Sequence, residues 1–179
     1  MVGLGNPGDR YADTRHNIGF QTARALAEDW RLGRERRRFA GLIREGGAGP
    51  GGPRVAVLLP QTYMNEAGRS AGPARGALKL PLERVLVIHD DIDLAFGDVR
   101  HRVGGGLAGH NGLKSLAREL GGTEFGRVRI GVGRPEATDP RVVSDYVLSR
   151  FSEPADQVRR LVDQAREVAE RVVLEAPAG

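Results

Sequence analysis

Cysteine is absent from the 179 residues of this chain, and lysine occurs only twice, at Lys79 and Lys114. The lack of cysteine excludes disulfide frameworks, thiolate zinc sites and cysteine nucleophiles. It also fits the reducing cytosol, and the first residues show no basic-then-apolar signal peptide, so we expect a cytoplasmic location. No apolar stretch approaches the roughly 20 residues that a membrane helix requires, so we expect no membrane association.

Arginine supplies the other 25 basic residues, and the formal net charge is +4 at pH 7. A basic excess favours an anionic partner, and the guanidinium group suits bidentate contact with phosphate. A G+C-rich genome would also enrich arginine over lysine, and we take that as the main cause of the imbalance. The run "RERRRF" at residues 34–39 is either a solvated connection, which we favour, or a surface that faces RNA.

Strands and helices alternate along the chain. The apolar patterns predict strands over residues 2–4, 40–45, 54–60, 84–91 and 127–133, and helices over residues 17–32, 63–80, 111–120 and 152–176. We expect a further strand to contain Arg100 and Arg102, which are separated by one residue and so share a strand face. This alternation is typical of an α/β fold whose sheet is at least partly parallel. The length favours one domain over residues 1–179.

Three glycines at the start, Gly3, Gly5 and Gly8, have the G-x-G-x-x-G spacing of a dinucleotide-binding turn. Pro7 interrupts the run, however, and the residue before a proline is pushed out of helical geometry. The dinucleotide motif needs a helix that begins inside the glycine run, so we disfavour it here. We expect instead that these glycines let the backbone turn tightly after the first strand.

Polar side chains follow the predicted strands, at the edge where open α/β sheets form their sites. Asn6 follows the first strand, Asn65 follows the strand at residues 54–60, and Asp90 ends the strand at residues 84–91. His16 opens the first helix and can serve as a base at neutral pH, with Asp90 as the carboxylate that orients it. Asn111 opens the helix at residues 111–120 and offers both donor and acceptor groups.

Each of these residues also has a simpler interpretation. A histidine at a helix start is often a capping or surface residue, and Asn6 before a proline is a common turn residue. Asp90 and Asp91 could begin a turn or bind a cation. His89 followed by Asp90, Asp91 and Asp93 suggests a metal site, but no matching histidine-rich segment exists. We therefore expect no metal.

Taken together, five stretches resemble the bacterial peptidyl-tRNA hydrolase family. They are "VGLGNPGDRYADTRHNIGF", "PQTYMNEAGRSAGP", "VIHDDIDLAFGDVRHRVGGGLAGHNGLKSL", "RVRIGVGRP" and "DPRVVSDYVLSRF", which together span Val2 to Phe151. The resemblance implies a single α/β domain with a twisted mixed sheet flanked by helices. It also implies hydrolysis, without a cofactor, of the ester between a peptide and the terminal ribose of tRNA that has left the ribosome. We expect a monomer whose partner is peptidyl-tRNA, held at its acceptor end and peptide.

The resemblance also implies roles for individual residues. His16 corresponds to the general base, Asp90 to its supporting carboxylate, and Asn6 to the residue that helps to distinguish peptidyl from free aminoacyl groups. The implied substrate, water and tRNA ligands and the walls of the crevice are Asn65, Asn111, Tyr11, Tyr63, Met64, Arg100, Arg102 and Arg129. Arg129 could instead form a salt bridge on the sheet. Two other functions stay open, an RNA-binding protein that does not hydrolyse and a hydrolase of another small acyl ester.

Overall fold

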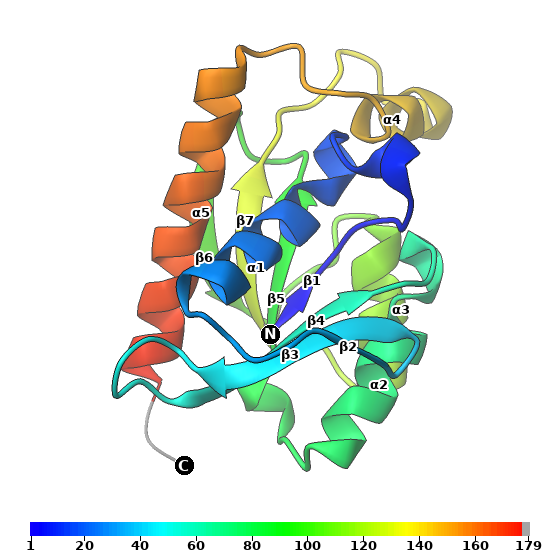
Figure 1. Ribbon diagram of the computed structural model, residues 1–179. Helices are drawn as coiled ribbons and strands as arrows, with labels where there is room; N and C mark the ends of the chain where they lie inside the picture. The colour runs from blue at the N-terminus through cyan, green and yellow to red at the C-terminus, as the bar shows by residue number, and fades with distance from the viewer. Residues whose placement is uncertain (177–179) are drawn as a thin grey trace.

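The computed structural model describes residues 1–176, which form a seven-stranded sheet flanked by helices (Figure 1). The strands are β1 (Val2–Gly3), β2 (Arg36–Arg38), β3 (Gly41–Gly47), β4 (Arg54–Pro60), β5 (Leu86–Asp91), β6 (Val99–Val103) and β7 (Gly126–Gly131). The helices are α1 (Ile18–Asp29), α2 (Gly68–Ala77), α3 (Asn111–Leu120), α4 (Pro140–Val147) and α5 (Ala155–Glu175). Four short 3-10 turns are η1 (Asp9–Tyr11), η2 (Arg15–Asn17), η3 (Met64–Glu66) and η4 (Leu82–Arg84).

The sheet is mixed, in the order β2-β3-β4-β1-β5-β7-β6. Strands β4, β1, β5 and β7 run parallel to one another, while β3 pairs antiparallel with β2 and β4, and β6 pairs antiparallel with β7. The predicted α/β fold with a mixed sheet is therefore confirmed. The carboxyl ends of the four parallel strands meet at one edge, which we call the carboxyl-end edge.

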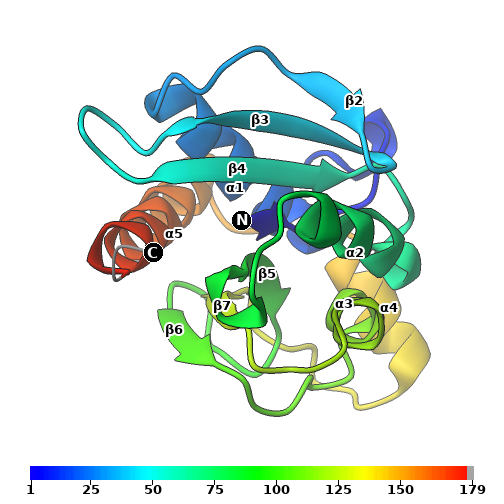
Figure 2. The same cartoon turned by 90° about the horizontal axis from the view of Figure 1, so that it is seen from below.

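Helices cover both faces of the sheet and divide the core into two clusters. On one face, α1 and α5 pack around Ile18, Leu26, Ile88 and Leu161. On the other face, α2 and α3 enclose a second cluster that includes Phe125. Viewed from below, α5 lies on one side of β5 and β7, and α2 and α3 lie on the other (Figure 2). The all-apolar start of β5 follows from this double cover, because both faces of the strand are buried.

The expected tight turn at the opening glycines is wrong for two of the three. Only Gly8 has a positive φ, of 100°. A Cβ at Gly3 would lie 2.6 Å from Cβ of Ala23, and one at Gly5 would lie 2.5 Å from the ring of Phe20. These two glycines therefore let α1 pack closely against the end of β1. Because α1 begins only at Ile18, no helix starts inside the glycine run.

The predicted elements are present, with ends shifted by at most three residues, except for one helix, and two further elements were not predicted. The helix expected over residues 63–80 is split into η3 and α2 and ends at Ala77. The strand β2 was missed because its three residues are all exposed and carry no alternating pattern. The helix α4 was also missed; it has one buried residue, Val147, although Asp139 caps it and Pro140 begins it. None of the described helices is both long enough and apolar enough to cross a membrane.

Candidate active site

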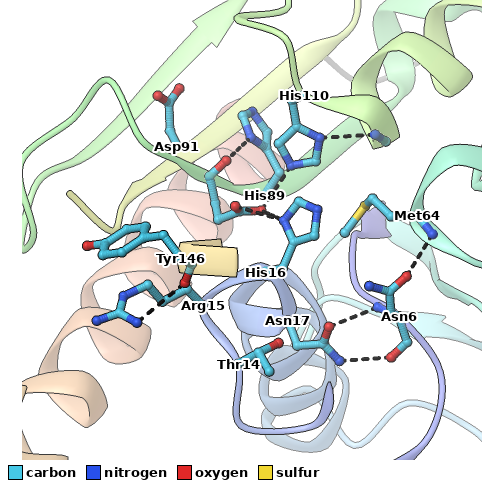
Figure 3. A network of polar contacts seen from close by, with 12 residues as sticks. Asn6, Thr14, Arg15, His16, Asn17, Met64, His89, Asp91, His110 and Tyr146 are labelled. Carbon is cyan, nitrogen blue, oxygen red and sulfur yellow. Dashed lines mark hydrogen bonds and ion pairs between the residues drawn. The ribbon is translucent and has the colours of Figure 1, made fainter. Parts of the chain in front are cut away.

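The carboxyl-end edge of the sheet brings together polar side chains that lie far apart in the sequence. His16 comes from η2, just before α1, and Asp90 comes from β5. The Nδ1 atom of His16 lies 2.9 Å from both carboxylate oxygens of Asp90, although 74 positions separate the two residues. Figure 3 shows His16 within a polar network that also contains His110, His89 and Asn6. The structure thus places the two residues in the arrangement of a base and its orienting carboxylate.

A second histidine binds the same carboxylate. His110 Nε2 lies 2.9 Å from Oδ1 of Asp90, whose side chain is only 2% exposed. Burial by itself raises the pKa of the Asp90 carboxyl. The attraction of His16 and His110 and their hydrogen bonds outweigh burial and hold that pKa well below its ordinary value. Asp90 is therefore an anion with both oxygens occupied.

The hydrogen bonds of His110 determine which of its nitrogens carries the proton. His110 is the N-cap of α3, and its Nδ1 accepts from the backbone N–H of Gly112 at 3.1 Å and of Leu113 at 3.3 Å. Since Nδ1 acts as an acceptor, the ring proton lies on Nε2 and is donated to Asp90. His110 is therefore fixed as a donor to Asp90 through Nε2.

The same reasoning leaves one imidazole nitrogen free for proton transfer. His16 donates to Asp90 through Nδ1, so its Nε2 keeps the lone pair. Within residues 1–176 that Nε2 has no hydrogen-bond partner, and the side chain is 12% exposed. His89 is different, because its Nδ1 donates to the carbonyl oxygen of Asp90 at 2.7 Å. Burial, aided by the neighbouring His110, lowers the pKa of His89 to about 3, so this ring is neutral and sealed from solvent.

The metal site considered from the sequence is not assembled. The carboxylate of Asp91 accepts a hydrogen bond from Arg129 Nε at 2.7 Å, and Asp93 pairs with Arg134. Among the described residues, one group has the composition of a metal site, with ligand atoms within 4.8 Å of one another; it consists of His16, Asp90 and His110. In this group, Nδ1 of His16 and Nε2 of His110 are each hydrogen-bonded to the carboxylate of Asp90.

Two hydrogen bonds from the side chain of Asn17 hold the backbone of Asn6 just after β1. Its N–H donates to Oδ1 of Asn17 at 2.8 Å, and Nδ2 of Asn17 donates to the carbonyl of Asn6 at 2.9 Å. The Oδ1 of Asn6 accepts from the backbone N–H of Met64 at 2.8 Å. With that oxygen occupied, the Nδ2 group of Asn6 remains as a donor, and it has no partner within the described residues.

The remaining predicted residues occupy several positions at this edge. Met64 is buried against the start of α3, since a Cβ at Gly112 would lie 2.5 Å from its Sδ. This contact joins η3 to α3, and Asn65 and Asn111 are exposed at the adjoining ends. Tyr63 precedes them and is 62% exposed.

The basic residues occupy the β6 side of the sheet. Arg100 and Arg102 are exposed and two residues apart in β6, so they share one face. Arg129 lies directly across from Arg100 in the strand register, and its side chain is 17% exposed. The salt bridge considered for Arg129 is present, with Asp91. Tyr11 is half-buried in η1.

Sequence reasoning missed four residues that organise the site: His110, Asn17, Arg15 and Arg127. Arg127 is buried and donates to the carbonyls of Gly104 and Gly106, which fixes the three-glycine segment at residues 104–106, before α3. Arg15 is buried and donates to the carbonyl of Arg150 at 2.6 Å, which ties the segment after α4 to the residue before His16. Its partners lie more than 130 positions away, so no local pattern could reveal them. His110 and Asn17 could have been found from the sequence, because His110 directly precedes Asn111 and Asn17 directly follows His16.

A groove of about 930 Å³ lies elsewhere, at the amino ends of the parallel strands. Its walls are mainly apolar and include Val2, Ile43, Leu78 and Val173. It lies at the opposite end of the sheet from His16 and Asp90, neither of which lines it. The chemistry therefore favours the carboxyl-end edge as the candidate active site.

Comparison with known proteins gives a consistent result. A family model described as peptidyl-tRNA hydrolase matches residues 1–178. The chain is 46% identical to the peptidyl-tRNA hydrolase of Sorangium cellulosum, over 96% of this chain and 78% of that protein. It is also 46% identical to that of Geotalea daltonii, over 98% of this chain and 90% of the relative.

A solved structure shares the architecture as well. The crystal structure of peptidyl-tRNA hydrolase from Acinetobacter baumannii superposes with a TM-score of 0.85 at 35% identity. The match covers 97% of this chain and 87% of the other.

Proposed function

This chain belongs to the peptidyl-tRNA hydrolase family and hydrolyses the ester bond of peptidyl-tRNA, and we propose that it does so with His16 as the general base. The observation that carries this proposal is the contact between His16 Nδ1 and both oxygens of Asp90 at 2.9 Å. That contact orients the ring and leaves Nε2 to accept a proton from water.

The first step is the attack of water on the ester carbonyl. Nε2 of His16 takes a proton as the water oxygen forms its bond to the carbonyl carbon. The anionic Asp90 stabilises the imidazolium that results, and it keeps its own charge throughout. General base catalysis of this kind contributes about 10²–10⁴-fold to the rate.

The tetrahedral intermediate carries a negative oxygen that needs donors. The hydrogen bonds of Asn6 with Asn17 and with the N–H of Met64 fix the position of its Nδ2 group. This group can therefore donate to the negative oxygen without reorganisation. One well-placed donor is worth about 3–4 kcal/mol. Asn65 and Asn111 hold the substrate and the water from η3 and α3. When the intermediate collapses, the C–O bond to the ribose breaks and the imidazolium returns its proton to the ribose oxygen.

Discrimination follows from the chemistry of the first amide of the peptide. A peptidyl group presents a neutral amide there, whereas a free aminoacyl group presents an ammonium. A site whose donors match an amide cannot pair that ammonium, and an unpaired charged group is costly. Asn6 contributes to this selectivity through its fixed amide, and Tyr11, Tyr63 and Met64 form the walls around the peptide.

The tRNA part of the substrate meets arginines at the β6 edge. Arg100 and Arg102 are exposed and contact phosphate, and Arg129 supports the same surface from β7. These contacts recognise the backbone and not the base edges, so we expect little selectivity among tRNAs. The mechanism needs neither a metal nor a cofactor, and we propose that the protein acts as a cytoplasmic monomer.

The direct test compares hydrolysis of N-acetyl-aminoacyl-tRNA with that of unblocked aminoacyl-tRNA. We expect cleavage of the first and near inertness toward the second. The His16→Ala variant should lose turnover while its affinity for tRNA stays within about twofold of the wild type. A parallel loss of turnover and tRNA affinity would instead assign His16 to binding.

A further inference from the structure

The excess charge of the chain is concentrated in one short segment. Residues 31–40 contain five arginines and one acidic residue, Glu35, which gives 5 − 1 = +4, the same as the formal charge of the whole chain. The other residues together are therefore neutral. All five arginines are exposed; they are Arg31, Arg34, Arg36, Arg37 and Arg38. We call residues 31–40 the β2 arginine segment, since they contain strand β2.

Most of this charge is not neutralised by neighbouring carboxylates. Arg36 pairs with Glu45. The guanidinium of Arg38 lies over the ring of Phe39, 4.6 Å from its centroid. Within residues 1–176, Arg31, Arg34, Arg37 and Arg38 form no ion pair. Several unpaired arginines in one segment produce a positive field that attracts a polyanion.

The segment leads directly to the candidate active site. Strand β2 pairs antiparallel with β3, and β3 with β4, so β2 runs in the direction of β4 toward the carboxyl-end edge. The register aligns Arg38 with Gly41, and Gly41 with Pro60. Beyond these residues the backbone N–H of Gln61 donates to the carbonyl of Ala40 at 2.9 Å. Figures 1 and 2 both show the β2–β3 turn on the side of the molecule where α2 begins.

The residues after Gln61 form one wall of the site. Three positions further on, the N–H of Met64 holds the side chain of Asn6. The turn that ends the β2 arginine segment is therefore joined through one short connection to a residue that contacts the reacting ester.

The arginines of β2 alternate between the faces of the sheet. Arg36 and Arg38 lie opposite Ile43 and Gly41, on the face covered by α2, because a Cβ at Gly41 would lie 2.7 Å from Oγ of Ser70. With a rise of about 3.3 Å per residue, their Cα atoms are about 6.6 Å apart. Arg37 projects to the opposite face. The edge thus offers cations on both faces.

We propose that the β2 arginine segment is a second phosphate-binding surface for the tRNA of the substrate. This inference rests on the proposed function. Strands β2 and β6 are the two edges of the sheet, so the segment lies on the opposite side of the site from Arg100 and Arg102. An RNA whose 3′ end enters between these edges meets cations on both sides.

The alternative explanation is that charges on an edge strand block pairing with another molecule. Charges of either sign would protect the edge strand, and a mixture of both signs would do so without creating a strong positive field. A polyanionic partner explains why the charged residues of this segment are almost all arginines and why they lie beside the site.

The test uses the Arg37→Gln/Arg38→Gln double variant, which spares the pair between Arg36 and Glu45. The probe is deacylated tRNA, and the measurement is its Kd as a function of KCl concentration. Loss of two phosphate contacts should flatten the slope of log K against log salt by about 1.4–1.8, the values for single strands and for a duplex. We expect Kd to rise about tenfold at moderate salt, and KM for N-acetyl-aminoacyl-tRNA to rise in parallel.

The matched control is the Arg159→Gln/Arg171→Gln variant, which removes the same charge from exposed positions of α5. It should keep the wild-type Kd and salt slope. Equal effects in both variants would show that only the total charge matters, and this would contradict a specific role for the segment. Wild-type binding by the β2 variant would overturn the proposal. Self-association of that variant with unchanged tRNA affinity would establish edge protection instead. Since deacylated tRNA carries no ester, this result does not depend on whether His16 is the base.

Discussion

Replacement of Asp90 by asparagine would remove the carboxylate without changing the size of the side chain. The amide offers one oxygen where the carboxylate offers two. His110 must keep its proton on Nε2, because its Nδ1 already accepts from two backbone N–H groups of α3. The single oxygen of the introduced amide would therefore accept from His110 and leave the NH₂ group of that amide facing His16.

This arrangement predicts the loss in rate. Facing an NH₂ donor, His16 would accept at Nδ1 and carry its proton on Nε2, so the lone pair that takes the proton from water would be lost. A wrong tautomer of this kind costs about 10⁴-fold in the serine protease triad. We expect kcat of Asp90→Asn to fall about 10³–10⁴-fold, or about 4–5.5 kcal/mol.

The assay is steady-state hydrolysis of N-acetyl-aminoacyl-tRNA, with the Kd of deacylated tRNA as the control for folding and binding. The Kd should remain within about twofold of the wild type. A fall in kcat of less than tenfold, with the fold intact, would refute the reasoning about the tautomer.

Substitutions at three other positions probe the supporting structure. His110→Asn retains an N-cap but loses the hydrogen bond to the buried Asp90 carboxylate, so it should lower the free energy of unfolding by about 1.5–3 kcal/mol and kcat at least tenfold; His110→Ala should lose about 1 kcal/mol more, because it also loses the cap. The pKa of His89 is lowered to about 3 on folding, so the unfolded chain binds the extra proton and stability falls by about 1.4 kcal/mol per pH unit as the pH drops from 6 to 4. His89→Gln should flatten that slope in denaturant unfolding. Gly3→Ala places a methyl group 2.6 Å from Cβ of Ala23 and should destabilise the protein by about 1–3 kcal/mol, measured by the same unfolding.

The sequence contains enough information for the central part of the sheet and for the position of the site. Apolar runs predicted β3, β4, β5 and β7, and polar residues at strand ends pointed to Asn6 and Asp90 at one edge. These features are local, because each depends on the period of a strand or on the residue that ends it.

The features that were missed depend on contacts between distant segments. His110 acts on Asp90 only because the start of α3 packs beside β5. Arg15 is buried by residues of the chain after α4, and Gly3 is required by the approach of α1. Strand β2 has no buried residue, so only its pairing with β3 defines it. Local sequence patterns cannot predict such contacts.

The protonation state of His16 is the central claim, and ¹⁵N NMR of its imidazole in the free enzyme tests it most directly. At a pH where the ring is neutral, the account predicts a proton on Nδ1, donated to Asp90, and an unprotonated Nε2. A spectrum with the proton on Nε2 would contradict the account, because that nitrogen could not then take a proton from water.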